Sequence, residues 1–253
     1  MTTNASHVFY ISKAEKNGRD VNRKTIGELL GINIKDVMVN NINYEDYYQI
    51  PGAVSFPLKT IYPGLLIGAG YTHTYKSVKK SQDKKQAEPG DFQLGFFFDH
   101  TTGMPVVPGS SVKGVLKSVF PRDADKPEIQ NEKKKYLLEI KGSGLTKDDF
   151  SHWQEIFFER GQVFHDAYIS DVYIGQTIFA DDYITPHTKG IFKNPEPHRF
   201  LKIAPGVTFT FQFILKDWNE KCKAENIANV FKQILLDFGI GAKRNVGYGT
   251  FIE

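Results

Sequence analysis

Two adjacent cations, Lys243 and Arg244, are the residues best suited to bind an anion, because they lie in a glycine-rich stretch near the C-terminus and are followed by Asn245. The glycines of this stretch are Gly239, Gly241, Gly247 and Gly249. Glycine is favoured where the backbone is left-handed or where another group must approach closely. The stretch predicts a loop that binds an anion such as phosphate, although a plain glycine turn would show the same pattern.

The glycine-rich stretch does not match the motifs that bind nucleotide phosphates. It lacks the Gly-Lys-Ser/Thr ending of a P-loop and the third glycine of a dinucleotide fingerprint. Both motifs run from strand to loop to helix, whereas an amphipathic helix over residues 224–238 is expected before this loop and a strand over 246–252 after it. We therefore expect no nucleotide or other cofactor.

A second group of candidate anion ligands surrounds the start of an expected helix after Pro108. Val112, Val115 and Val119 mark its core face, and Ser110 is its expected N-cap. A helix N-terminus offers unpaired N–H groups and a partial positive charge. The residues that would form a phosphate cradle there are Gly109, Ser110, Ser111, Lys113 and Lys117. The alternative is an ordinary capped helix with a solvated lysine face, from which Lys113, Gly114 and Lys117 project away from the core.

Catalytic and metal-binding patterns are weak in this sequence. The histidines show neither H-x-x-H nor H-E-x-x-H spacing, and the one cysteine, Cys222, cannot complete a zinc site by itself. Asp99, Asp181 and Asp182 are the only acidic residues that we would test for nuclease chemistry, and acidic residues in turns more often cap the chain. We expect neither catalytic residues nor a metal site.

Composition is that of one folded domain over residues 1–253, with 40% hydrophobic residues. The net charge of +3 is only mildly basic, so an RNA partner is permitted but not required. A single cysteine, no signal peptide and no membrane-spanning run lead us to expect a cytoplasmic protein without a membrane partner.

The expected elements follow the order strand, helix, strand, strand, helix, strand, which is the α+β, ferredoxin-like (RRM-like) βαββαβ arrangement. The strands are expected at residues 58–68, 163–169, 207–213 and 246–252, with a hairpin over 92–107. Phe209, Phe211 and Phe213 could stack on bases, but we expect them to face the core. Large additions are expected as an N-terminal extension (1–56), a lysine-rich loop (72–91), a helical insertion (121–161) and a long irregular insertion (170–205).

Several motifs together carry a resemblance to a known family. They are PVVPGSSVKG at 105–114, VFHDAY at 163–168, DYITPH at 182–187, FLKIAPG at 200–206 and the C-terminal glycine-rich stretch. In this order they resemble the RAMP superfamily of CRISPR proteins, and within it the sixth-subunit family of type III-B Cmr effector complexes. The lysine-rich loop departs from the family pattern, and it could contact RNA, contact a neighbouring subunit or simply be solvated.

The resemblance implies a non-catalytic, guide-RNA-binding subunit of an antiviral ribonucleoprotein, near the 3′ part of the guide, with target RNA as a second potential ligand. Its implied neighbours are the backbone RAMP subunit, another terminal RAMP subunit and the small helical subunit. Carried over to this chain, it nominates Ser110, Ser111, Lys113, Lys243, Arg244 and Asn245 for contact with guide phosphates. Two alternatives remain open: a metal-dependent RAMP endoribonuclease that cuts guide precursor or target RNA, and a protein adaptor without RNA contact.

Overall fold

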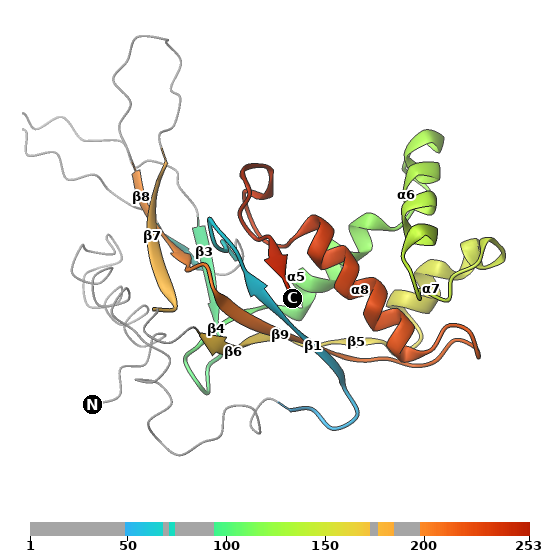
Figure 1. Ribbon diagram of the computed structural model, residues 1–253, viewed down its shortest axis with the longest axis horizontal. Helices are drawn as coiled ribbons and strands as arrows, with labels where there is room; N and C mark the ends of the chain where they lie inside the picture. The colour runs from blue at the N-terminus through green and yellow to red at the C-terminus, as the bar shows by residue number, and fades with distance from the viewer. Residues whose placement is uncertain (1–48, 68–70, 74–93, 173–176, 185–197) are drawn as a thin grey trace, which may run out of the picture.

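A computed structural model describes residues 49–67, 71–73, 94–172, 177–184 and 198–253 (Figure 1). Within these residues, eight strands form one antiparallel sheet in the order β10-β1-β9-β6-β4-β3-β2, with β5 also paired to β9. Their bounds are β1 (Val54–Thr60), β2 (Tyr71–His73), β3 (Leu94–Phe98), β4 (Pro105–Val107), β5 (Val163–Phe164), β6 (Ala167–Val172), β9 (Val207–Ile214) and β10 (Phe251–Ile252). Strands β7 (Phe179–Ile184) and β8 (His198–Ile203) form a separate hairpin.

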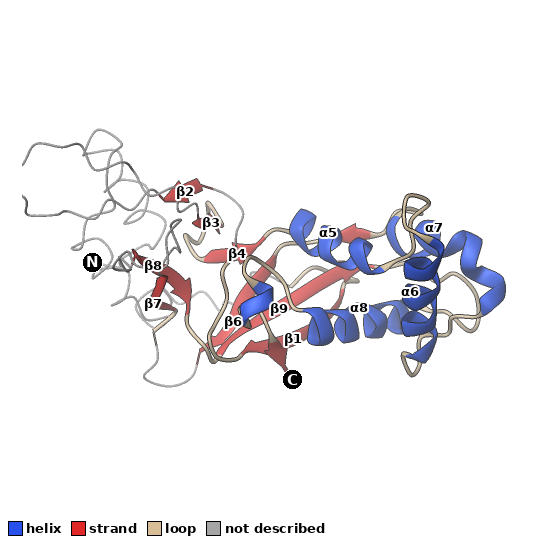
Figure 2. Cartoon of the chain, turned by 90° about the horizontal axis from the view of Figure 1, so that it is seen from above, coloured by secondary structure: helices blue, strands red, loops and turns tan. Residues whose placement is uncertain are grey.

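Four α-helices in the described residues accompany the sheet, namely α5 (Gly109–Val119), α6 (Pro127–Glu139), α7 (Trp153–Phe158) and α8 (Ala224–Phe238). Short 3₁₀ helices span Lys147–His152 and Arg244–Val246. The helices gather toward one end of the molecule and the β7–β8 hairpin lies toward the other (Figures 1 and 2). None of the helices in the described residues is long and apolar enough to span a membrane.

Strand β9 shows how the sequence builds the core. Phe209, Phe211 and Phe213 alternate with Thr and Gln, and at most 1% of each Phe is exposed. The ring of Phe213 lies 5.2 Å from that of Phe231 on α8, so these aromatic side chains pack under the helices. The expectation that they face the core is confirmed, and none of them is accessible for stacking on a base.

Helix α8 has the bounds that its apolar spacing predicts. Ile227, Val230, Phe231, Ile234 and Leu235 on its predicted face are buried. The prediction is wrong for Phe238, which lies in the last turn and is 42% exposed. Its ring packs edge-on against Tyr136 of α6. One amphipathic face therefore fixes the helix that leads into the glycine-rich stretch.

The mixed helix and antiparallel strand content confirms the α+β class, but several expected strands have other bounds. Residues 58–68 do not form one strand, because β1 begins at Val54 and the chain turns after Thr60. The strand expected at 163–169 is divided into β5 and β6, which both pair with β9. The terminal strand covers only Phe251–Ile252, since Arg244–Val246 form a 3₁₀ turn. The hairpin of β3 and β4 is confirmed.

The segments expected as additions contain regular structure. Residues 121–161 hold α6 and α7. Residues 170–205 are not simply irregular, because Phe179–Ile184 and His198–Ile203 pair along their whole length. Within 1–56, Val54 already belongs to β1, and within 72–91 only residues 72–73 are described, so most of the N-terminal and lysine-rich segments lie outside the described residues.

Candidate nucleic-acid interface

The glycine loop, defined here as residues 239–249, folds back on itself after α8. The Ile240 amide donates a hydrogen bond to the Gly249 carbonyl (2.9 Å), and φ is positive at both Gly239 and Gly249. A β-carbon on Gly239 would collide with the Gly249 carbonyl oxygen, and one on Gly249 would collide with that of Ile240. Both positions therefore require glycine, because the two ends of the loop pack backbone against backbone.

Gly241 also meets the protein's own backbone. A β-carbon there would collide with the Leu66 carbonyl oxygen, which accepts a hydrogen bond from the Ala242 amide (2.8 Å). The close approach that the sequence predicts at Gly239, Gly241 and Gly249 therefore involves protein rather than ligand. These glycines anchor the loop, and its side chains supply the charge that a ligand could meet.

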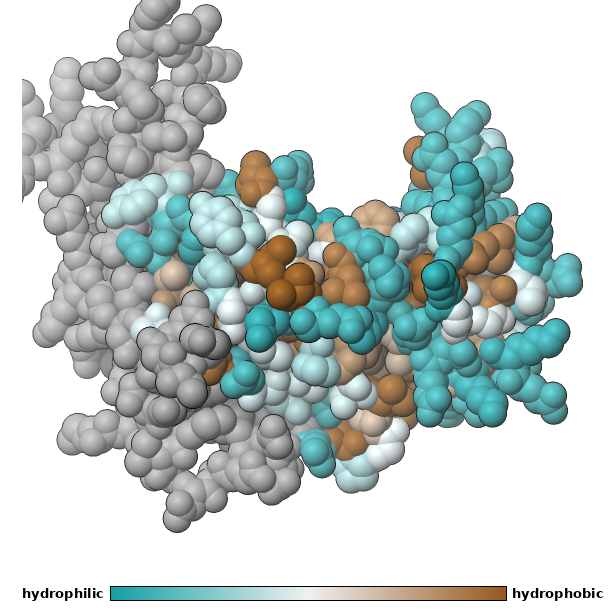
Figure 3. Space-filling view, viewed as in Figure 1, coloured by the Kyte–Doolittle hydropathy of each residue, from teal (hydrophilic) through white to brown (hydrophobic). Residues whose placement is uncertain are grey.

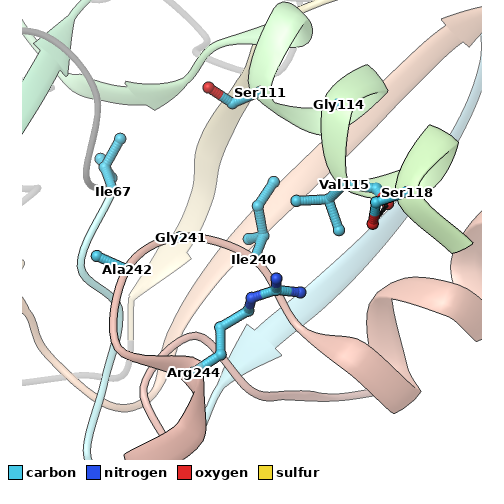
Figure 4. A pocket seen from close by; sticks show the side chains of 9 residues that line it. All are labelled: Ile67, Ser111, Gly114, Val115, Ser118, Ile240, Gly241, Ala242 and Arg244. Atoms are coloured by element: carbon cyan, nitrogen blue, oxygen red, sulfur yellow. Dashed lines mark hydrogen bonds between the residues drawn. The ribbon is translucent and has the colours of Figure 1, made fainter. Parts of the chain in front are cut away.

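A groove of about 370 Å³ separates the glycine loop from α5 (Figure 4). Its lining residues are Ile67, Ser111, Gly114, Val115, Ser118, Ile240, Gly241, Ala242 and Arg244. Figure 4 shows the Arg244 side chain extending from the loop toward α5, with Ser111 and Ser118 at different heights of that helix. The fold thus joins two motifs that lie far apart in the sequence, as a composite anion site requires.

Gly114 gives the groove an open wall. It lies inside α5, where glycine costs roughly 0.5–1 kcal/mol relative to alanine, yet a β-carbon at this position would meet no protein atom within 4 Å. No contact in the described structure accounts for the missing side chain. The sequence places Gly114 on the solvent side of the helix without marking it as a ligand contact, although a glycine inside an amphipathic helix is a usable signal.

The N-terminus of α5 is already occupied by a carboxylate. The Gly109 amide donates a 2.7 Å hydrogen bond to Asp166 Oδ1. The expected N-cap Ser110 is wrong: the helix begins at Gly109, Pro108 is the cap residue, and Ser110 is exposed in the first turn. A phosphate at this end would face the negative charge of Asp166, so the available anion site lies along the side of α5.

Lys113 turns inward rather than toward a ligand. Its ammonium donates a 2.8 Å hydrogen bond to the Phe158 carbonyl and lies 5.2 Å from the centre of the Phe164 ring. Lys117 is half-buried in the last turn of the same helix. Gly109 is buried against the backbone of Phe164 and His165. Of the five residues nominated around this helix start, only Ser111 lines the groove.

The tip of the glycine loop carries the remaining candidates. Arg244 and Asn245 are exposed, and one Arg244 nitrogen caps α8 by donating to the Phe238 carbonyl (3.3 Å). Lys243 adopts a left-handed conformation, φ 58°, and is half-buried, which lowers the pKa of its ammonium. Gly247 packs near Pro63. Arg244 is the nominated cation that both lines the groove and faces solvent.

Two candidate nuclease residues, Asp99 and Asp182, make structural hydrogen bonds. Asp99 accepts hydrogen bonds from the Thr101 and Thr102 amides and so closes the β3–β4 turn. Asp182 accepts a 2.6 Å hydrogen bond from Lys202 and another of 2.6 Å from the Tyr248 hydroxyl. In the described part of the chain, no group of three or more His, Cys, Asp or Glu side chains could hold a metal ion.

The hydrogen bond from the Tyr248 hydroxyl to Asp182 anchors the loop to the β7–β8 hairpin, within which Asp182 and Lys202 form an ion pair. Burial alone would raise the pKa of Asp182, but the hydrogen bonds from Lys202 and Tyr248 outweigh it and lower that pKa. Beside them, Leu66, Phe200 and Tyr248 form a small apolar cluster against which Ala242 packs. Sequence patterns do not connect Lys202 with Tyr248, because their contact depends on the β7–β8 hairpin, which the sequence does not predict.

Comparison with known proteins places this geometry in a family. The RAMP superfamily model matches residues 57–252, which include β1, α5, α8 and the glycine loop. The chain belongs to the RAMP superfamily.

Within that superfamily the chain is similar to the CRISPR system CMR subunit Cmr6 of Saccharolobus solfataricus, with 26% identity over 164 residues. That match covers 63% of this chain and spans about half, 49%, of the relative. The chain also aligns with a chain of the type III-B Cmr-beta complex bound to cognate target RNA, with 24% identity, a TM-score of 0.48 and coverage of 97% of this chain and 71% of the other. The alignment with Cmr6 from Pyrococcus furiosus shows 22% identity, a TM-score of 0.46 and coverage of 79% and 97%.

Proposed function

We propose that this protein is a non-catalytic guide-RNA-binding subunit of a type III-B CRISPR effector complex, acting in the cytoplasm near the 3′ part of the guide. The observation that carries the proposal is the groove between α5 and the glycine loop, where Arg244 supplies charge, Ser111 a hydroxyl and Gly114 room for a backbone. Membership of the RAMP superfamily and similarity to a Cmr6 subunit support this assignment.

We further propose that β1, β6, β9 and β10, with α5 and α8, correspond to the ferredoxin-like core. The order β10-β1-β9-β6 within the sheet supports this, because it puts the last strand beside the first and the third strand between the first and second. This core sets the start of α5 and the end of α8 on one side of the sheet. Strands β4, β3 and β2 extend the edge at β6.

The proposed neighbours are the backbone RAMP subunit, a second terminal RAMP subunit and the small helical subunit, with target RNA held through the guide. RNA contact through Arg244 should be mainly electrostatic. For single-stranded RNA, each lost phosphate contact lowers the slope of log affinity against log salt by roughly 0.7.

The test compares Arg244→Ala with Lys135→Ala in guide-RNA binding across a salt series. Both variants remove one positive charge, and Lys135 is a 78% exposed side chain on α6. We expect weaker binding and a slope lower by roughly 0.7 for Arg244→Ala only. Equal slopes for Arg244→Ala and the unmodified protein would overturn the phosphate site.

The nuclease and adaptor alternatives predict other outcomes. Incubation with guide precursor or target RNA and magnesium should give no cleavage; cleavage abolished by Asp99→Ala or Asp181→Ala would establish an enzyme instead. Co-purification with RAMP subunits but without any RNA crosslink to this chain would establish an adaptor.

A further inference from the structure

Tyr62 is an exposed aromatic side chain beside the glycine loop. It is 81% exposed, in the turn that follows β1, and the next residue, Pro63, lies near Gly247 of the loop. A large ring left this open is unusual for packing alone, because aromatic rings contribute most to stability when buried. The position of Tyr62 at the loop therefore needs a reason other than core formation.

The ring of Tyr62 lies beside the ammonium group of Lys202. The Lys202 ammonium lies 5.8 Å from its centre and 5.7 Å from the centre of the Tyr248 ring, within the range of cation–π contact. Lys202 is itself fixed by its 2.6 Å ion pair with Asp182, and only 7% of its side chain is exposed. The fixed Lys202 ammonium therefore contacts one side of Tyr62, while most of the ring faces solvent.

The surroundings of this ring have the composition of a site for single-stranded nucleic acid. Val246, 67% exposed, and the exposed Arg244 and Asn245 occupy the nearby loop tip, which appears in Figure 3 as an apolar spot beside hydrophilic surface. Proteins that bind single strands combine aromatic rings that stack on bases with nearby cations that contact the backbone. The same loop lines the groove through Arg244 on its α5 side.

We propose that Tyr62 stacks on an unpaired base of the RNA whose backbone contacts the Arg244 groove. This inference rests on the proposed function, and it adds contact with a base to a site otherwise expected to read phosphates. It also restricts the ligand at the loop to single-stranded RNA, because a paired base inside a helix cannot offer its face to a side chain.

The test uses the full-length chain and a single-stranded RNA that carries 2-aminopurine at successive positions. Tyr62→Ala should bind the RNA roughly 5- to 100-fold more weakly, because it loses the contact with one stacked base. Tyr62→Phe keeps the ring, and its RNA affinity should stay within about twofold of that of the unmodified protein. The salt slope should not change in either variant. Fluorescence quenching of 2-aminopurine at one position should disappear in Tyr62→Ala and persist in Tyr62→Phe.

Tyr183→Ala is the matched control, because Tyr183 is 60% exposed and neighbours Asp182 in β7, so its side chain points to the opposite face of the hairpin. It should bind RNA normally. If Arg244→Ala lowers the salt slope but Tyr62→Ala binds RNA normally, the stacking inference is overturned while the proposed function stands. If Tyr62→Ala instead impairs only co-purification with other subunits, Tyr62 contacts protein and the inference is likewise overturned. If neither variant affects RNA binding, both proposals fail.

Discussion

Gly239 and Gly249 lie so close together that a β-carbon on Gly239 would overlap the carbonyl oxygen of Gly249. This contact closes the base of the glycine loop and directs Arg244 and its neighbours outward. The glycines therefore act through the fold, and the chemistry of the loop resides in the side chains at its tip and along the groove.

Replacing Gly249 by alanine should destabilise the protein by about 2–5 kcal/mol, since it adds a collision with Ile240 to the cost of a left-handed residue. The control is Gly52→Ala, because Gly52 has nearly the same φ, +78° against +75°, but no atom within 4 Å of the added carbon. Urea denaturation should show the larger loss for Gly249→Ala. Equal losses would mean that conformation alone, and not close contact, requires this glycine.

Gly114→Ala should raise the free energy of unfolding by about 0.5–1 kcal/mol and yet weaken guide-RNA binding. The new methyl group meets no protein atom but narrows the groove, and a disturbed contact there should cost about 1–2 kcal/mol, a factor of 5–30 in affinity. Asn131→Ala on the exposed face of α6 is the control, because it also favours a helix but lies outside the groove. Stabilisation with unchanged RNA affinity would show that no ligand approaches Gly114.

Asp166→Ala should destabilise the protein by about 0.5–2 kcal/mol, since the Gly109 amide loses its acceptor. Asp166→Asn retains an acceptor and should cost less. Because the groove lies along the side of α5, neither variant should change RNA affinity by more than about twofold. A large gain in affinity on removal of this charge would instead locate the phosphate at the helix N-terminus.

The ion pair of Asp182 and Lys202 should make stability depend on pH. The folded-state pKa of Asp182 is lowered, so its contribution is complete above the unfolded pKa, about 3.9, and is lost as pH falls through the folded pKa. Asp182→Asn should therefore cost about 1–3 kcal/mol near neutral pH and progressively less below about pH 4. Denaturation curves at several pH values test this, with Glu132→Gln on α6 as a surface control. If the difference in free energy of unfolding between Asp182→Asn and the unmodified protein does not depend on pH, the charges of the ion pair contribute nothing to stability.

The sequence predicts the periodic elements well and the long-range contacts poorly. The bounds of α8 follow from its apolar spacing, because one buried face determines the helix. The sequence cannot predict the direction of the Lys113 side chain, since this side chain points inward to the carbonyl of Phe158, which lies in a distant insertion. The sequence also cannot show why residues 239 and 249 are glycine, because close contact with a ligand and close contact with the protein backbone both require glycine.

The central claim is that RNA lies between α5 and the glycine loop, and photo-crosslinking of the full-length chain to guide RNA tests it most directly. Mapping of the crosslinked peptides should place the same stretch of guide nucleotides on peptides from both walls, residues 111–118 and 240–244. Crosslinks confined to other surfaces, with both walls unmodified, would contradict the account.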